Sequence, residues 1–324
     1  MKVQSSKLNV QSFGFGIGLL LLLASTIFVA ALLGSEKLSF FDLSEQQKTI
    51  LYDIRLPRIL LGASVGASLA LAGASLQSLL RNPLAEPYLL GVSNGAALGT
   101  MLAFVFFSQV EFARPVMAFA GASLATFVVY QMAKSRAGMN VERLVLSGVI
   151  VTTFLSSIIV LLTSLVDATK LRSFTFWLLG DLSQATKNGF YLNFFAVLIG
   201  TFVLMRTARA LNLMMIGERD AFDFGVEVEK TRLIVFAVSS LLVGTAVAAS
   251  GSVGYVGLIV PHLVRLAKGS DNRLVIPFSA LAGAIFVVLA DTVARVAIAP
   301  RELPVGAITA LIGAPLFIYL LRRN

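Results

Sequence analysis

The feature that most constrains this chain is a series of long stretches that contain no charged residue. The first covers residues 8–35, and comparable stretches follow at 59–80, 87–110, 115–133, 144–166, 188–205, 233–264, 274–290 and 303–321. A helix needs about 20 predominantly apolar residues to cross a bilayer. The pattern therefore predicts an all-α, polytopic membrane protein.

Composition supports this interpretation. Hydrophobic residues make up 57% of the 324 residues and charged residues only 13%, whereas soluble domains carry about 25% charged residues. The net charge of +9 raises the question of nucleic acid, but the basic residues are spread between apolar blocks, as membrane topology requires. We expect a lipid membrane as partner and no nucleic acid. The chain has no cysteine, which excludes disulfides and thiolate metal sites.

The stretch 233–264 is too long for one simple crossing. Its glycines are Gly244, Gly251, Gly254 and Gly257. Each glycine weakens a helix interior by about 1 kcal/mol relative to alanine. We therefore predict a full helix at about 231–250 and a shorter returning helix at about 255–267, which makes about ten crossings.

Charge distribution favours ten crossings over nine. With ten, most of the 26 Lys and Arg residues fall on the side of the N-terminus, as the positive-inside rule expects; with nine, the bias reverses. Both termini are then predicted to be cytoplasmic. The first stretch is longer than a signal-peptide core of about 7–15 residues, so we expect it to be retained.

The chain also contains a weak internal repeat. "VGASLALAG" at 65–73 resembles "VGTAVAASG" at 243–251, and at the same spacing Pro83 matches Pro261 and Gly91 matches Gly269. Five predicted helices separate the copies, which would make the repeat inverted, as in many transporters. Chance similarity between two Ala/Gly-rich helices is the alternative. No linker composition appears, so we expect one domain, 1–324.

Three regions go beyond generic membrane composition. They are "DIRLPRILLGASVGASLALAGASLQSLLRNPLAEPYLLGVSNGAALG" at 53–99, "LNLMMIGERDAFDFGVEVEKTR" at 211–232, and "GSVGYVGLIVPHLVRLAKGSDNRLVIPFSALAGA" at 251–284 with the following "ADTVAR" and "ELPVGAITALIGAPLF". Together they resemble the FecCD-type permeases, membrane subunits of binding-protein-dependent ABC importers for iron-siderophore complexes, haem and cobalamin. The resemblance is colinear over nearly the whole chain. It implies the type II permease fold, a homodimer around one central pathway, and the cytoplasmic (inner) membrane of a bacterium.

Energy for transport is expected to come from a partner. The chain has no G-x-x-x-x-G-K-[ST] motif to hold nucleotide phosphates. The charge-free stretches offer no Asp or Glu of the kind that proton-coupled carriers usually need. We therefore expect a transport subunit rather than an enzyme, with no cofactor bound by this chain and ATP used by a separate ATPase subunit. An ion-coupled secondary transporter remains the alternative.

The predicted contact with that ATPase is a cytoplasmic coupling segment at about 211–230. Its charged residues alternate with apolar ones, as in short amphipathic helices that dock into a groove. A plain loop is the alternative. By resemblance, "GERDAFDFG" enters a cleft of the ATPase, and the closest matches to the family motif are Gly217, Glu218, Asp220, Ala221 and Gly225.

Three arginines are predicted to receive the extracytoplasmic binding protein. Arg55 and Arg58 flank the start of the second crossing, and Arg295 ends "ADTVAR". Fixed cations at outer helix ends suit carboxylates on a docking protein, and the resemblance implies glutamates on the binding protein. Alternatively, these arginines only extend toward the membrane interface.

Two inner features complete the predicted site. Arg81, Asn82 and Pro83 begin "RNPLAEP", a cytoplasmic turn stiffened by its prolines, for which a part in transmitting ATPase closure is left open. His262, the only histidine, follows Pro261, which interrupts the helical hydrogen-bond ladder. A neighbouring polar side chain or water can satisfy the freed backbone groups. We interpret the pair as a structural bend and expect no metal ligand there.

The resemblance favours a chelated iron complex as cargo, with a ferric siderophore first and haem or cobalamin as alternatives. One further stretch, 173–181, contains the only tryptophan and is too short to span. Because Trp favours the membrane boundary, we predict an interfacial helix there.

Overall fold

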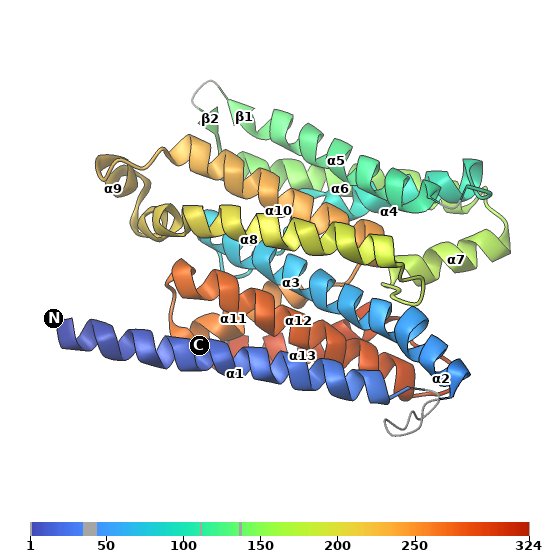
Figure 1. Cartoon of the computed structure of the whole chain (residues 1–324). Coiled ribbons are helices and arrows are strands. Elements are labelled where there is room, and N and C mark those ends of the chain that lie inside the picture. Colours follow the sequence, from blue (N-terminus) through green and yellow to red (C-terminus); the bar gives the residue numbers. More distant parts are fainter. Residues whose placement is uncertain (1, 35–43, 111, 136–137, 324) are drawn as a thin grey trace.

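The computed structural model describes residues 2–34, 44–110, 112–135 and 138–323 and shows a bundle of helices (Figure 1). The elements in chain order are α1 (Lys2–Leu32), α2 (Glu45–Thr49), the π-helical η1 (Ile50–Arg55), α3 (Leu56–Leu79), the 3-10 turn η2 (Pro87–Leu90), α4 (Val92–Phe106), α5 (Ala113–Ala133), β1 (Lys134–Ser135), β2 (Gly138–Met139), α6 (Val141–Thr163), α7 (Ala168–Leu178), α8 (Lys187–Ile216), α9 (Glu218–Asp223), α10 (Val228–Ser250), α11 (Val256–Lys268), α12 (Asn272–Val296) and α13 (Val305–Arg323).

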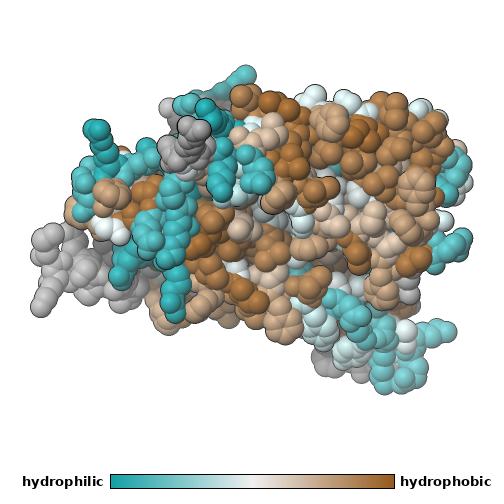
Figure 2. Space-filling view, turned by 90° about the horizontal axis from the view of Figure 1, so that it is seen from above, coloured by the Kyte–Doolittle hydropathy of each residue, from teal (hydrophilic) through white to brown (hydrophobic). Residues whose placement is uncertain are grey.

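The predicted membrane fold is confirmed. In the described part of the chain, seven helices are long and apolar enough to cross a membrane: α1, α3 with the preceding α2 and η1, α5, α6, α8, α10 and α12. The shorter α4, α11 and α13 correspond to the other three predicted crossings. Figure 2 shows an apolar middle with hydrophilic residues gathered toward the two ends of the bundle. The helix axes therefore run along the direction in which a bilayer would be crossed.

The division of 233–264 is also confirmed, and its cause is visible. Between α10 and α11 the backbone is not helical, with positive φ at Gly251 and Tyr255. The Tyr88 hydroxyl both accepts from the Val253 N–H and donates to the Val253 carbonyl, each at 3.0 Å. The Glu86 carboxylate accepts from the Tyr255 N–H at 3.2 Å. Irregular backbone at membrane depth is tolerated only where protein groups satisfy it, and the segment around η2 supplies them.

The centre of the bundle is α3. Almost all of its residues are buried, and it packs against α8, α10, α11 and α12. Its glycines let two neighbours approach closely: a Cβ at Gly66 would overlap the carbonyl of Gly283 in α12, and one at Gly73 would overlap the carbonyl of Gly257 in α11. Without a hydrophobic drive between helices in lipid, such close backbone packing holds helices together.

This packing gives a first prediction. Gly66→Ala should lower the stability of the purified subunit by about 1–3 kcal/mol, because the added methyl group forces α3 and α12 apart. Gly18→Ala on α1 is the matched control, since nothing lies within 4 Å of a Cβ there. Apparent unfolding temperatures in detergent compare the two. Equal stability of both variants would contradict the close packing.

The internal repeat is visible at its turns. α3 and α10 run in opposite directions (Figure 1). Gly91 and Gly269, at equivalent positions, both have positive φ and precede α4 and α12 respectively. The copies differ at their centres, because α3 continues through Gly73 whereas α10 ends just before Gly251.

Candidate coupling and docking sites

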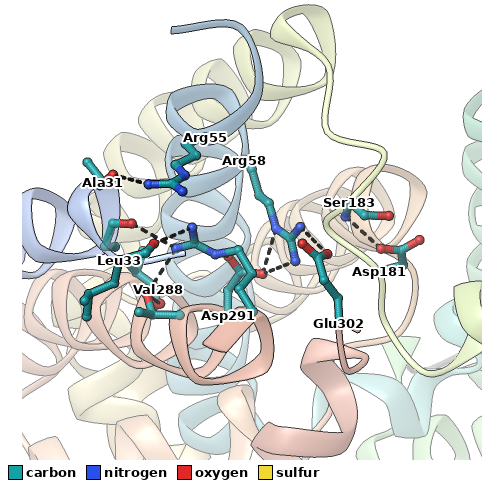
Figure 3. A network of polar contacts seen from close by, with 12 residues as sticks. Ala31, Leu33, Arg55, Arg58, Asp181, Ser183, Val288, Asp291 and Glu302 are labelled. Carbon is teal, nitrogen blue, oxygen red and sulfur yellow. Dashed lines mark hydrogen bonds and ion pairs between the residues drawn. The ribbon is translucent and has the colours of Figure 1, made fainter. Parts of the chain in front are cut away.

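The three arginines predicted at the outer end lie together but are not exposed. Arg55 ends η1 and Arg58 lies in the first turn of α3 (Figure 3). Arg295 lies in the last turn of α12. Their residue exposures are 5%, 7% and 4%. A set of freely accessible cations is therefore not what the structure shows, and the predicted docking role has to work through a largely buried cluster.

The cluster is organised around Asp291 of α12. Arg58 places Nε 3.0 Å and Nη2 2.9 Å from Asp291 Oδ1. Arg295 Nε lies 3.1 Å from Asp291 Oδ2. A second carboxylate, Glu302 in the connection to α13, accepts from Arg58 Nη1 at 2.6 Å. Arg58 and Arg295 thus share Asp291, and Arg58 has Glu302 as a second carboxylate partner.

The remaining donors of the cluster cap the end of α1. Arg295 donates to the carbonyls of Ala30 and Leu33, both at 3.1 Å. Arg55 donates to the Ala31 carbonyl at 3.1 Å. The last carbonyls of a helix lack intrahelical partners and carry its negative dipole end. Arg55 and Arg295 therefore join the end of α1 to η1 and α12, and they hold positive charge near this end of the bundle.

At the opposite end of the bundle, the predicted coupling segment contains a short helix, α9, joined to α8 through Gly217. Ala221 is fully buried and anchors the segment, whereas the apolar side chains of Ile216, Phe222 and Phe224 are each more than 70% exposed. Gly225 follows with φ +80° and turns the chain toward α10. Asp220 lies on the exposed side.

Glu218 connects this segment to the predicted cytoplasmic turn. Its carboxylate accepts from Arg81 at 2.6 Å and also pairs with Arg232 at the start of α10. Arg232 in turn pairs with Glu229 at 2.5 Å and donates to the Met139 carbonyl of β2 at 2.9 Å. Two segments that the sequence presents as separate candidates therefore form one ionic network.

The turn itself is stabilised locally. The Asn82 side chain accepts from the Leu84 N–H at 2.9 Å, Pro83 is exposed, and Arg81 has φ +49°, which an L-residue seldom adopts. Strained backbone of this kind persists where surrounding contacts hold it. Here the ion pair with Glu218 is one such contact.

A second network at this end lies about one helical turn before α9. Asn212 of α8 donates to Asp271 at 2.7 Å and accepts from the Asn272 N–H at 2.8 Å, and Asn272 accepts from Ser78 of α3 at 2.6 Å. Hydrogen bonds from Arg273 hold the pKa of the Asp271 carboxyl down at about 2, so it stays ionised throughout the physiological range. These hydrogen bonds fix α8, which leads into α9, to the start of α12, and they connect the start of α12 to the end of α3.

Pro261 lies inside α11, and the helix continues through it to Lys268. Proline has no N–H for the carbonyl four residues earlier, which is that of Gly257. Gln77 of α3 supplies the missing donor: its side-chain amide lies 3.3 Å from the Gly257 carbonyl and 3.0 Å from that of Leu258. His262 makes an edge contact with Phe317. The polar compensation expected near Pro261 therefore comes from Gln77.

This arrangement predicts a non-additive pair. Gln77→Leu should destabilise the protein by about 1–3 kcal/mol, since it leaves buried carbonyls unsatisfied. In a Pro261→Ala background the same change should cost less, because the restored N–H can bond to Gly257. Unfolding temperatures of the four variants in detergent measure the coupling. Additive effects would show that Gln77 does not compensate for the proline.

The tryptophan stretch, 173–181, begins inside α7, which starts earlier, at Ala168, and ends at Leu178. At eleven residues α7 is too short to span. It lies at the same end of the bundle as α2 (Figure 1). A cavity of about 800 Å³ opens beside it, with Phe119, Trp177 and Leu192 among its walls and Arg114 and Arg172 among its polar groups. The prediction of a short helix at one boundary of the bundle agrees with this position.

No group of three or more His, Cys, Asp or Glu side chains that could hold a metal ion occurs among the described residues. The polar side chains described above form ion pairs and hydrogen bonds at the two ends of the bundle, and α3 fills its centre. This arrangement suits the binding of other proteins at the ends and movement of the helices relative to one another.

Comparison with known proteins gives the family. The model of the FecCD transport family matches residues 19–323. The chain belongs to the FecCD transport family. It is 45% identical over 282 residues to the cobalamin import system permease protein BtuC of Halobacterium salinarum, covering 87% of this chain and 76% of that protein.

Two further similarities support the FecCD assignment. The chain is 38% identical to the hemin transport system permease protein HmuU of Yersinia pestis, with 94% of each chain covered. A solved structure of a transporter assigned to the metal-chelate type of ABC transporters, in an inward-facing conformation, superposes with a TM-score of 0.88 at 34% identity. It covers 96% of this chain and 99% of the other.

As a FecCD permease, the chain is a transport subunit of an ABC importer and not an enzyme, and ATP hydrolysis lies with a separate ATPase subunit. This bears out the expectation drawn from the absence of a phosphate-binding motif.

Sequence reasoning missed two residues of the FecCD permease that organise its ends. Asp291 just follows the charge-free stretch 274–290, yet it lies one helical turn before Arg295, an i,i+4 spacing that favours a pair. Gln77 carried no comparable signal, because its partners lie 180 positions away in the chain.

Proposed function

We propose that this FecCD permease carries a chelated iron complex, first of all a ferric siderophore, across the cytoplasmic (inner) membrane of a bacterium. The observation that carries the proposal is that the two ends of one bundle differ: a buried arginine cluster lies at one end, and apolar side chains of α9 are exposed at the other. Similarity to permeases named for cobalamin and hemin import keeps those two cargoes as alternatives.

The inner contact with the ATPase would be α9. Gly217, Glu218, Asp220, Ala221 and Gly225 shape it, and the exposed Phe222 and Phe224 would enter a groove of the ATPase, as amphipathic helices do. Through Glu218, a displacement of α9 would pull on Arg81 and Arg232 together. The predicted part of the Arg81–Asn82–Pro83 turn in transmitting ATPase closure gains its support from this link.

The outer contact would be the arginine cluster. A binding protein presenting acidic side chains would meet Arg58 first, because its partner Glu302 is 42% exposed while the other carboxylate, Asp291, is 2% exposed. Arg55 and Arg295 would contribute to docking mainly by fixing the end of α1 to the bundle and through their positive charge.

The pathway would form between two copies of the chain. Buried α3 side chains fill the middle of the single bundle, so a cargo-sized route fits better along an interface than through one subunit. With an even number of crossings and α9 on the inner side, both termini would be cytoplasmic.

The test of the proposed cargo is uptake in proteoliposomes. The permease, its ATPase and its binding protein are reconstituted together, and ATP-dependent uptake of a ferric siderophore, haem and cobalamin is compared. The proposal expects the ferric siderophore to be taken up fastest. Preferential uptake of haem or cobalamin would replace the cargo and leave the machinery intact, whereas uptake of none would contradict the assignment.

A further inference from the structure

We propose that Glu302 is an exchangeable counter-ion of Arg58: it fills, in the undocked permease, the carboxylate position that an acidic side chain of the binding protein takes over on docking. This inference rests on the proposed docking function and names the position at which the partner's carboxylate binds. It also says what occupies that position beforehand.

Two carboxylates of different exposure hold Arg58. Asp291 is almost fully buried and contacts both Arg58 and Arg295, so it is a fixed part of the cluster. Glu302 contacts Arg58 through Nη1 only, and 42% of its side chain is exposed. Rotation of the Glu302 side chain alone would release this bond and leave the rest of the cluster in place.

The charges of the described contacts favour exchange of the carboxylate over its simple loss. Arg58 and Arg295 share Asp291, and Glu302 supplies the second carboxylate for these two guanidinium groups. A buried arginine that loses its partner is strongly unfavourable. Arg58 Nη1, which pairs with Glu302, therefore needs a carboxylate at all times. Replacement of Glu302 by a carboxylate of the binding protein keeps this group paired, whereas loss of Glu302 without a replacement does not.

The other two arginines contact main-chain carbonyls at the end of α1. Arg55 donates to the Ala31 carbonyl, and Arg295 donates to those of Ala30 and Leu33. These acceptors are main-chain groups at the end of α1, so an incoming carboxylate could reach the donors only by disrupting the contact between α1 and the bundle. Arg58, by contrast, has a carboxylate partner that can be exchanged by side-chain movement alone, and its planar fork suits carboxylates.

The backbone around Glu302 supports an exchange confined to the side chain. Leu303 donates to the Ala294 carbonyl at 3.0 Å, and Arg301 donates to the Ile298 carbonyl at 3.0 Å. The connection between α12 and α13 is thereby fixed on both sides of Glu302. The geometry keeps Arg58 in place while its carboxylate partner changes.

The experiment measures the affinity of the binding protein for the full permease–ATPase complex in nanodiscs, at low and at high salt. Glu302→Gln removes the resident competitor and should tighten docking about tenfold at low salt, the size expected for a hydrogen bond to a charged group. Asp53→Asn is the matched control. It removes one negative charge from the exposed Asp53–Lys187 pair near the same end and should change affinity by less than about twofold.

The double variant Glu302→Gln/Arg58→Gln distinguishes failure of the carboxylate exchange from failure of the proposed docking function. Glu302→Gln should tighten docking only when Arg58 is present. The exchange is overturned by any of three results for Glu302→Gln: a change in docking affinity no larger than that of Asp53→Asn, a weaker docking affinity, or a gain in affinity that persists in the Arg58→Gln background. If Arg58→Gln alone leaves docking unchanged while remaining monodisperse, the proposed docking function fails as well; if it weakens docking, that function stands whatever Glu302 does.

Discussion

Replacing both Phe222 and Phe224 with serine should separate this permease from its ATPase. Both side chains are more than 70% exposed in the free subunit, beside the fully buried Ala221 that fixes α9 to the bundle. Burial of a phenylalanine side chain contributes about 1.5–3 kcal/mol. Loss of two such contacts should weaken ATPase binding by at least about 100-fold, measured by titrating the ATPase onto the permease in nanodiscs.

The matched control is Phe106→Ser at the end of α4. Its side chain is 68% exposed, and α4 ends away from α9 (Figure 1). ATPase affinity should be unaffected there. Near-normal binding by the Phe222/Phe224 double variant would mean that α9 does not enter the ATPase, and equal losses in both variants would indicate a general defect of the bundle.

The second large effect is expected at Asp291. Asp291→Asn leaves Arg58 and Arg295 in their buried positions without the carboxylate that both contact. Removal of one partner from a buried ionic cluster typically costs about 3–5 kcal/mol, a large part of the total stability of a protein. The apparent unfolding temperature in detergent should fall by about 5–10 °C.

Asp53→Asn again serves as control, because its pair with Lys187 is exposed on both sides, and such pairs contribute little. It should leave the unfolding temperature unchanged. If Asp291→Asn behaved in the same way, the arginine cluster would have to be held together by the carbonyls at the end of α1.

How far the sequence predicts this fold depends on the range of the interactions involved. Helix number and the break near Gly251 follow from the length of apolar stretches and from glycine positions, which are local properties, and both are found. The family assignment rests on whole motifs and is likewise confirmed.

The candidate sites depend on contacts between residues far apart in the chain, and the sequence predicts the residues of these sites but not their contacts. The sequence predicts Arg55, Arg58 and Arg295 at outer helix ends. It does not show that all three are buried, or that Arg55 and Arg295 contact the end of α1, because that requires knowing how α1, α3 and α12 pack. In the same way, "RNP" and "GERDAFDFG" are readable as separate motifs, whereas the Arg81–Glu218 contact joins residues 137 positions apart.

The central claim is that this subunit is a passive gate moved by an ATPase that binds its inner end. The most direct test compares radiolabelled ferric siderophore uptake by vesicles containing the permease alone, under imposed proton and sodium gradients, with uptake by vesicles that also contain the ATPase and binding protein. The account predicts uptake only by vesicles that contain all three components, with ATP supplied on the side of the membrane that carries the ATPase. Gradient-driven uptake by the permease alone would contradict it.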